Sequence, residues 1–522
     1  MSAAPFFGSR IGDAEVYDEW AQDIAAGDWI GDRVFYQAPL YPYFLGMVYS
    51  FVGNDTGLVL KLQALLGSLS CVLLGLATWR LFGKGAGITA GFLLAFYAPV
   101  LFYESLLQKS VLDIFCLSLA LLLISKLLIL QTKAKWCALG LAMGALVLAR
   151  ENALVFVIAV LIWIAALRTA DSQPSVSGDD IKTRRNRFTV RATWAACFLT
   201  GVALVLFPVA LRNKLVGGEF HLTTSQLGPN LYIGNNSDAN GTYQPLRFGR
   251  GHARHERDDA TAIAEQAVGR PLTSSEVSSF YVGRVVNYVR SHPVDWLRLM
   301  TRKLALVWNA GELIDTEDAH TYAQWSMPLR LTLNVWHFGV LAPLAVLGIA
   351  LTWNRRRELW IFYLLIAVYT ASVALFFVFG RYRLPLVPML IPFAAAGIVN
   401  IISLFRSQEK RKLAACLVCV LAFGIVCNLP LVDAHKMQAI SYSNIGNALA
   451  KQGKFDEAVR FYERSLRITP DNALAHNNLG VALTHLGQHQ TAVQHYKTAL
   501  QIEPDYATAR KNLTRLTVKS GS

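Results

Sequence analysis

The sequence predicts an all-α membrane protein, in which a polytopic bundle of transmembrane helices is followed by a module of repeated helices. Three observations predict this fold class. Apolar residues make up 54% of the 522 residues, long apolar segments recur along the chain, and the C-terminal region repeats with a period of 34 residues. Soluble domains are less apolar than this, whereas a helix that crosses a bilayer needs about 20 apolar residues.

Ten apolar segments are candidate transmembrane spans, of which 136–149 and 153–168 are the shortest. The ten spans are 58–82, 85–103, 110–131, 136–149, 153–168, 192–211, 331–353, 359–379, 384–405 and 413–433. They divide the chain into a first outer loop (1–57), spans one to six (58–211), a large outer loop (212–330), spans seven to ten (331–433) and a tail (434–522).

Basic residues follow the odd-numbered spans, and this alternation predicts the orientation. These connectors contain Arg80/Lys84, Lys133/Lys135, Lys182/Arg184/Arg185/Arg187/Arg191, Arg355/Arg356/Arg357 and Arg406/Lys410/Arg411/Lys412. Basic connectors favour the cytoplasmic side, so both outer loops and the tail are expected on the periplasmic face of a bacterial inner membrane. The net charge of +14 lies largely in these connectors. This placement favours anionic lipid over nucleic acid as a partner.

The N-terminal region leaves two topologies open. No apolar span precedes residue 57, although the orientation places residues 1–57 outside. Either a further helix lies upstream of Met1, which we expect, or the uncharged run Val34–Gly53 crosses the membrane. Its prolines and four tyrosines are typical of the membrane interface. If this run crossed, residues 1–33 would be cytoplasmic and the site described below could not form.

The tail contains two matched repeats, 442–475 and 476–509, and a capping helix over Ala507–Thr517. Six positions recur after 34 residues: Gly446, Gly453, Ala458, Tyr462, Leu466 and Pro470 return as Gly480, Gly487, Ala492, Tyr496, Leu500 and Pro504. Small residues allow two helices to approach closely, and proline ends the second helix. The pattern resembles the tetratricopeptide repeat. It leaves open a folded appendage for self-association or a docking site for a protein partner or acceptor.

The first outer loop contains an acidic helix followed by an aromatic and proline-rich run. Its motifs are Asp13…Tyr17, Gly27-Asp28-Trp29 and Tyr36…Pro39-Leu40…Tyr43, and Arg381-Tyr382-Arg383-Leu384-Pro385 follows much later. Together these motifs resemble the C superfamily of glycosyltransferases, in its protein mannosyltransferase and aminoarabinose transferase branch. The resemblance covers roughly residues 10–405. It implies transfer of a sugar from a polyprenyl-phosphate (dolichyl-phosphate-type) donor, with inversion.

The resemblance implies that Asp13 is the catalytic base, by its position in the first outer loop. A carboxylate can take the proton from an acceptor hydroxyl while that oxygen attacks the sugar. The alternative is that Asp13 is one of seven solvated surface acids. The chain departs from some relatives at Gln37-Ala38-Pro39, where they have Glu-Lys before the prolines. Any charge supplied by that lysine must therefore come from elsewhere.

Further candidates are ionisable side chains near the outer ends of spans. Glu104 is a second catalytic acid, whereas Lys109, Arg381 and Arg383 are expected to bind the donor phosphate, which guanidinium groups match well. Possible supporting residues are Glu15, Asp18, Asp113, Arg150 and Glu151. The alternative for Lys109 and Asp113 is a purely structural pair, because ionisable groups in spans also pair with each other.

The large outer loop is expected to bind the acceptor or sugar through a turn-rich segment. The candidates are Asn235, Asn236, Tyr243 and Arg247. A helix is predicted over 274–291 behind the capping box Thr273…Glu276, followed by an interfacial helix from Pro293. His252 and His255 are weak evidence for metal, so we assign no metal site, predict no certain cofactor and leave a divalent ion open. All seven cysteines lie in or at the ends of spans, which offers no disulfide framework.

These features predict a membrane glycosyltransferase that acts on a hydroxyl acceptor at the periplasmic face. Nucleotide sugars stay in the cytoplasm, so a lipid-linked donor is the kind that reaches outward-facing residues. Two other function classes stay open. One is a membrane-anchored tetratricopeptide scaffold for envelope assembly. The other is a transporter, which would need polar or broken-helix sites near the middle of the membrane.

Overall fold

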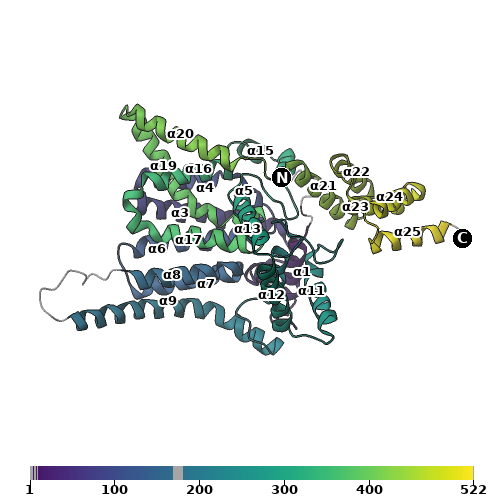
Figure 1. Cartoon of the computed structure of the whole chain (residues 1–522), viewed down its shortest axis with the longest axis horizontal. Helices are drawn as coiled ribbons and strands as arrows, with labels where there is room; N and C mark the ends of the chain where they lie inside the picture. Colours follow the sequence, from purple (N-terminus) through teal and green to yellow (C-terminus); the bar gives the residue numbers. More distant parts are fainter. Residues whose placement is uncertain (1–3, 5–7, 9, 168–179, 521–522) are drawn as a thin grey trace.

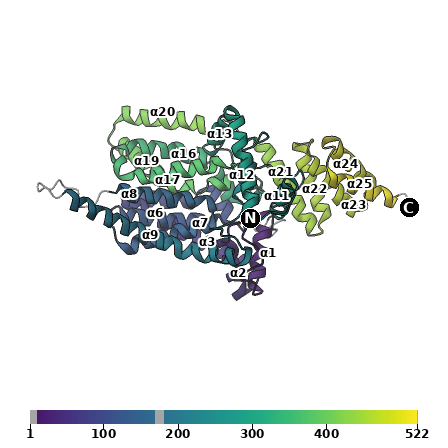
Figure 2. The same ribbon diagram turned by 60° about the horizontal axis from the view of Figure 1, so that its bottom comes forward.

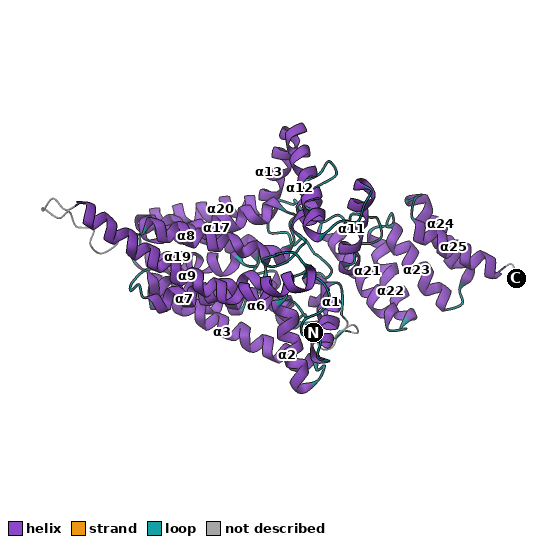
Figure 3. Ribbon diagram, turned by 90° about the horizontal axis from the view of Figure 1, so that it is seen from below, coloured by secondary structure: helices purple, strands orange, loops and turns teal. Residues whose placement is uncertain are grey.

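The computed structural model describes residues 4, 8, 10–167 and 180–520, and within them the side chains of 180–187 and 519–520 are excluded. Parts of the first outer loop, residues 168–179 between spans five and six, and residues 521–522 at the end of the tail therefore lie outside the described residues. Regular structure in the described residues is helical throughout, as Figure 3 shows. The all-α prediction is confirmed for this part of the chain.

Five helices of the described chain are long and apolar enough to cross a membrane. They are α3 (Thr56–Phe82), α6 (Ser110–Leu127), the segment Phe188–Gly217 of α9 (Asp180–Gly217), η3 with α17 (Trp353–Arg355 and Arg356–Leu375), and α19 (Leu386–Arg406). Two bent pairs raise the number to seven if each is one span: α4 (Lys84–Ala95) with α5 (Ala98–Glu104), bent by 52°, and α15 (Met327–Leu333) with α16 (Phe338–Leu351), bent by 49°.

A helix or bent pair lies at each of the ten predicted spans. The three further helices are α7 (Lys133–Ala149), η1 with α8 (Glu151–Ala153 and Leu154–Ala166), and α20 (Lys410–Cys427). These helices are not among the seven that satisfy the length and hydropathy requirements. The number of ten spans therefore stays a prediction, while a multi-pass membrane protein is supported.

The run Val34–Gly53 contains only a short helix, α2 (Leu40–Val52). Thirteen residues at 1.5 Å each extend about 20 Å, which is less than the roughly 30 Å of a bilayer core. The helix packs on α1 (Asp13–Ala25), where Tyr17 and Tyr41 make an edge-to-face contact 5.4 Å between ring centres. Length and packing therefore favour the interfacial interpretation over a crossing.

Glycines let the bundle helices approach to backbone contact. A Cβ on Gly140 of α7 would lie 2.0 Å from the carbonyl oxygen of Phe198 in α9, and a Cβ on Gly348 of α16 would lie 1.8 Å from that of Phe393 in α19. Close approach through small residues is the usual packing mode of membrane helices, which gain little from the hydrophobic effect inside lipid. Larger residues at these positions would force the helices apart.

Two basic connectors lie together at one end of the bundle. Arg355 donates to the carbonyl oxygen of Leu81, and its guanidinium lies 5.6 Å from the centre of the Phe82 ring. Figure 1 shows that the start of α9 and the turn between α19 and α20, which belong to two further basic connectors, lie at this same end of the bundle. The outer-loop helices α11 (Ala253–Val268), α12 (Ser274–Ser291) and α13 (Pro293–Val307) lie at the opposite end, towards α1 and the tail (Figures 1 and 2). The outer loops also contain α10 (Leu227–Gly234), α14 (Ala319–Tyr322), η2 (Ala323–Trp325) and α18 (Gly380–Arg383).

The predicted helix over 274–291 is confirmed as α12, including its capping box. The side chain of Thr273 accepts from the backbone of Glu276, and the Glu276 carboxylate accepts from the Thr273 amide. Two backbone amides that the helix itself leaves unpaired are thereby satisfied. The helix that begins at Pro293 is confirmed as α13.

The tail consists of two helix pairs and a final helix. These are α21 (Ala434–Lys451) with α22 (Phe455–Ile468), α23 (Ala473–His485) with α24 (His489–Ile502), and α25 (Ala507–Ser520). A Cβ on Gly446 would lie 2.7 Å from the Tyr462 ring, and Gly480 has the same relation to Tyr496. The matched positions of the sequence repeat therefore make matched contacts, which explains why glycine and tyrosine recur together.

Candidate active site

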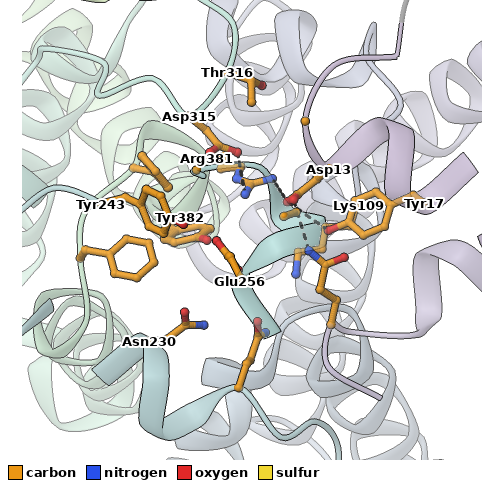
Figure 4. A pocket seen from close by; sticks show the side chains of 17 residues that line it. Asp13, Tyr17, Lys109, Asn230, Tyr243, Glu256, Asp315, Thr316, Arg381 and Tyr382 are labelled. Carbon is orange, nitrogen blue, oxygen red and sulfur yellow. Dashed lines mark hydrogen bonds and ion pairs between the residues drawn. The ribbon is translucent and has the colours of Figure 1, made fainter. Parts of the chain in front are cut away.

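Polar residues from distant parts of the chain line one cavity at the outer-loop end of the bundle (Figure 4). They come from α1, from the start of α6, from the large outer loop and from α18. The charged and hydroxyl-bearing residues among them are Asp13, Tyr17, Lys109, Tyr243, Glu256, Asp315, Thr316, Arg381 and Tyr382. The predicted residues Asp13, Lys109, Tyr243 and Arg381 are thus brought together, although up to 368 positions separate them (381 minus 13).

Gly12 allows the helix that carries Asp13 to approach the segment that carries Asp315. Its φ is +61°, and a Cβ at this position would lie 2.4 Å from the side chain of Thr316. Glycine adopts such a conformation at little cost and leaves room for the contact. Asp13 and Asp315 are each one residue away from this contact, and both line the cavity, with Arg381 between their carboxylates.

Arg381 joins these two carboxylates. Its Nη1 lies 2.7 Å from Asp13 Oδ2, its Nη2 lies 2.6 Å from Asp315 Oδ2, and its side chain is only 5% exposed. The Gln37 amide also donates to Asp13 Oδ1 at 3.2 Å, and Arg381 Nη1 donates to Gln108 Oε1 at 3.1 Å. The planar fork of a guanidinium suits two acceptors at once, so this residue fixes both acids relative to each other.

A second buried arginine holds Arg381 from behind. Arg150 pairs with Asp113 at 2.6 Å and donates to the backbone carbonyl of Arg381 at 3.3 Å, while its guanidinium lies 5.3 Å from the centre of the Tyr382 ring. Asp113 therefore pairs with Arg150 and not with Lys109, the partner that its sequence spacing suggested. The reason is tertiary: α7 ends beside the start of α6 and directs two nitrogens of Arg150 at one carboxylate oxygen.

Lys109 is left with its charge directed at the cavity. The residue is 7% exposed and lines the cavity beside Asp13. Within residues 10–167 and 180–520, no hydrogen bond or ion pair is found for its ammonium group. A buried ammonium group without a fixed partner is suited to an anionic ligand, since a bound anion would satisfy its charge.

The three acids of the cavity differ in protonation. Burial acts to raise the pKa of Asp13, but Arg381, Lys109 and Gln37 outweigh it and leave that pKa below its usual value. Burial raises the pKa of Asp315 to about 6, with Arg381 opposing and Asp13 adding to the rise. Burial likewise raises the pKa of Glu256 to about 7, although a hydrogen bond from Tyr243 opposes it. At neutral pH, Asp13 is ionised while Glu256 is divided between two forms.

These shifts predict a pH-dependent stability. Folded Glu256 and Asp315 keep protons that the unfolded chain releases, so the free energy of unfolding should fall as the pH rises from about 4 to about 7. Glu256 alone accounts for up to about 3 kcal/mol, at about 1.4 kcal/mol per pKa unit. Glu256→Gln should flatten this slope in thermal melts of the detergent-solubilised protein. Asp258→Asn, on the exposed face of α11, serves as the control; equal slopes in both variants would contradict the assignment.

The predicted acceptor residues of the large outer loop divide into two groups. Tyr243 lines the cavity and donates to Glu256. Asn235 is buried elsewhere, where its Oδ1 accepts from Trp296 and Lys303, both at 3.1 Å. The other two are also committed outside the cavity: Asn236 donates to the carbonyl oxygen of Tyr232, and Arg247 lies 3.7 Å from Asp259.

The other predicted residues of α1 stand behind the site. Asp18 is buried against Arg10 at 2.9 Å and accepts from Tyr49 at 2.8 Å, which fixes α1 on α2. Glu15 faces the tail and α11, with His252 at 3.3 Å and Lys451 at 2.6 Å. Neither carboxylate lines the cavity.

Three predicted residues elsewhere also stay outside the cavity lining. Glu151 accepts from Gln226, which is itself a lining residue, at 2.8 Å. Glu104 packs against Gly67 of α3, and Arg383 pairs with Glu312 at 2.6 Å. Arg381 and Arg383 therefore direct their charges to different places, because two residues along a single helical turn point to different sides.

Sequence reasoning missed Asp315, Glu256 and Gln108. Asp315 lies in the acid-rich run Glu312–Asp318 directly after α13, and that concentration of acids beside an interfacial helix was a usable signal. Glu256 lies in a highly charged helix, α11, whose sequence is typical of a solvent-exposed helix, so nothing distinguished it from its neighbours. Gln108, next to Lys109, gave no distinguishing signal.

The described residues do not form a metal site. No group of three or more His, Cys, Asp or Glu side chains converges within them in a way that could hold an ion. Asp13 and Asp315 both direct an oxygen at Arg381 instead. A divalent ion would have to displace this guanidinium, so the arrangement does not fit a resident metal.

Two segments of the chain match models of known protein families. Residues 36–175 match the family model of dolichyl-phosphate-mannose-protein mannosyltransferases, and residues 437–505 match the tetratricopeptide repeat. The predicted resemblance is confirmed. The mannosyltransferase match includes Gln37 and Lys109, whereas Asp13, Glu256, Asp315 and Arg381 lie outside it. The match covers less than half of the chain, so it supports a likeness of this segment to the mannosyltransferase family.

Solved structures give weaker likenesses. The oligosaccharyltransferase of Archaeoglobus fulgidus matches with 14% identity and a TM-score of 0.42, over 87% of this chain and 56% of that enzyme. ArnT from Cupriavidus metallidurans, bound to undecaprenyl phosphate, matches with 13% identity and a TM-score of 0.40, over 95% and 75%. The chain spans little more than half the length of the archaeal enzyme, and TM-scores this low carry no argument about activity. A comparison with curated proteins found no match.

Proposed function

We propose that this protein transfers a sugar from a polyprenyl-phosphate donor to a hydroxyl acceptor, with inversion, in the cavity of Figure 4. The observation that carries the proposal is the arrangement of Arg381 and Lys109 beside the Asp13 carboxylate in one buried cavity. Two cations meet the need of a departing phosphate, and a carboxylate meets that of a reacting hydroxyl.

In the proposed reaction the acceptor oxygen attacks the anomeric carbon from the face opposite the phosphate. Asp13 takes the hydroxyl proton, a glycosidic C–O bond forms, and the bond between that carbon and the phosphate oxygen breaks. The lipid phosphate leaves with the bonding electron pair. Arg381 and Lys109 stabilise its charge at the moment at which it develops.

The ion pair with Arg381 weakens Asp13 as a base. A carboxylate held by a guanidinium is ionised at neutral pH but only weakly basic. A donor phosphate would compete for Arg381, and this competition would return basicity to Asp13 when the donor is bound. Glu256, whose pKa is about 7, lies in the same cavity and is the second candidate for the base.

We further propose that the cavity and the tail face the periplasm of a bacterial inner membrane. The clustering of the Leu81 and Arg355 connectors at the opposite end of the bundle supports this orientation, since basic connectors favour the cytoplasm. The lipid chain of the donor would remain in the membrane, and the tail would meet a protein acceptor or partner.

The test is a transfer assay in membranes that contain the protein, with a panel of labelled polyprenyl-phosphate sugars and the corresponding nucleotide sugars. We expect label to move from one of the lipid donors to a hydroxyl-bearing acceptor, and none to move directly from nucleotide sugars. Transfer from nucleotide sugars in stripped membranes would contradict the donor class. Absence of transfer with every lipid donor would favour the scaffold.

A further inference from the structure

The first helix of the tail contacts the segments that carry both acids clamped by Arg381. The side-chain amide of Asn444 in α21 donates to the carbonyl oxygen of Thr316 at 2.7 Å. Two residues further along, the backbone amide of Asp318 donates to Ser441 Oγ at 3.2 Å. The loop that presents Asp315 is thus bonded to α21 directly beside that acid.

The same helix reaches the segment that carries Asp13. The ammonium of Lys451, at the end of α21, lies 2.6 Å from Glu15 Oε2, two residues beyond Asp13. Lys451 is 58% exposed, so this pair contributes little by itself. Its position matters more, because α1 is held by Lys451 from outside and by Thr316 at Gly12 from inside.

Comparison of the two repeats shows that only the first one bonds to Thr316. Asn444 and Asn478 occupy the same repeat position, 34 residues apart. Asn478 donates to Asn447 inside the tail at 2.8 Å, whereas Asn444 donates out of the tail to Thr316. Gln324 also donates to the Tyr442 hydroxyl of α21 at 3.0 Å, so several bonds join this helix to the outer loop.

We propose that α21 supports the catalytic site from outside the cavity, and that Asn444 and Lys451 are positioning residues that hold Asp315 and Asp13 about Arg381. This inference rests on the proposed glycosyl transfer and assigns the tail a part in it. The tail would then be required for transfer to any acceptor, including one too small to touch the repeats.

The test compares Asn444→Ala with its matched control Asn478→Ala in the full-length protein, with a small hydroxyl acceptor. Loss of one positioning hydrogen bond should lower kcat about fivefold and leave the donor KM nearly unchanged, because Lys109 and Arg381 remain. Asn478→Ala should keep wild-type kcat. Lys451→Met should give a smaller loss that Lys451→Arg restores.

Hydrogen–deuterium exchange gives a readout that does not depend on the reaction. Asn444→Ala should speed exchange over residues 312–320, whereas Asn478→Ala should not. If both variants keep wild-type kcat and exchange, or both lose kcat equally, the positioning role is overturned. If the wild type transfers no sugar, the proposed function fails, and the exchange comparison still decides whether α21 holds the Asp315 loop.

Discussion

Replacing Asp13 with Asn should lower transfer from a polyprenyl-phosphate sugar by about 10²–10⁴-fold, the usual contribution of a positioned base. The substitution removes the carboxylate that faces the cavity but keeps an oxygen that can accept from Arg381. Asp315 continues to pair with Arg381 at 2.6 Å, so the variant should fold and insert normally. The measurement is the initial rate per amount of protein in the membrane, at saturating donor.

Asp23→Asn is the matched control for this prediction. It is the same substitution on the same helix, at a position that is exposed and away from the cavity, and it should keep the wild-type rate. If Asp13→Asn keeps most of the activity while Glu256→Gln loses it, the proton is taken by Glu256. If neither variant loses activity, the reaction does not take place in this cavity.

Replacing Arg381 with Gln should have the second large effect, on both catalysis and stability. Removing a preorganised group that stabilises developing charge costs about 10²–10³-fold in rate. The variant also leaves two neighbouring carboxylates unpaired, and breaking a buried ion pair costs up to about 3–5 kcal/mol. We therefore expect little transfer and a lower melting temperature. Lowering the pH should recover part of the stability, because Asp315, whose pKa is already raised to about 6 with Arg381 beside it, then becomes neutral.

The conservative pair Arg381→Lys and Arg383→Lys separates phosphate binding from folding. Lysine keeps the charge but loses the planar fork. Arg381→Lys should raise the donor KM and lower kcat. Arg383→Lys should change the melting temperature alone, because Arg383 pairs with Glu312 outside the cavity. Equal rises in donor KM for both variants would show that the donor does not distinguish the two arginines.

The sequence pattern was sufficient to predict an element wherever the interactions that stabilise that element lie close together in the chain. The capping box of Thr273 and Glu276 lies within four residues, and α12 begins where it predicts. The 34-residue repeat likewise predicted the tail, because Gly446 and Gly480 each meet a tyrosine of the next helix within the same unit. Apolar runs marked the membrane helices for the same reason. They did not mark the bends that interrupt two of the runs.

Side-chain partners depended on contacts that no local pattern encodes. Spacing alone offered Lys109 as the partner of Asp113, but Arg150 takes that place from another helix. Arg381 and Arg383 look equivalent in sequence, and only the fold directs one at Asp13 and the other at Glu312. Asp315 needed the close approach at Gly12 to become part of the site.

The sequence by itself predicted an all-α membrane protein with a tetratricopeptide tail, and its motifs and family resemblance singled out Asp13, Lys109, Tyr243 and Arg381, which the fold brings to one cavity. These properties follow from composition, periodicity and motifs, which act over one helix or one repeat. Only the tertiary structure decided which charges neutralise each other, which acids share the cavity, and that the tail contacts the segments that carry Asp13 and Asp315. These outcomes depend on distances between residues hundreds of positions apart, and such distances are set by helix packing.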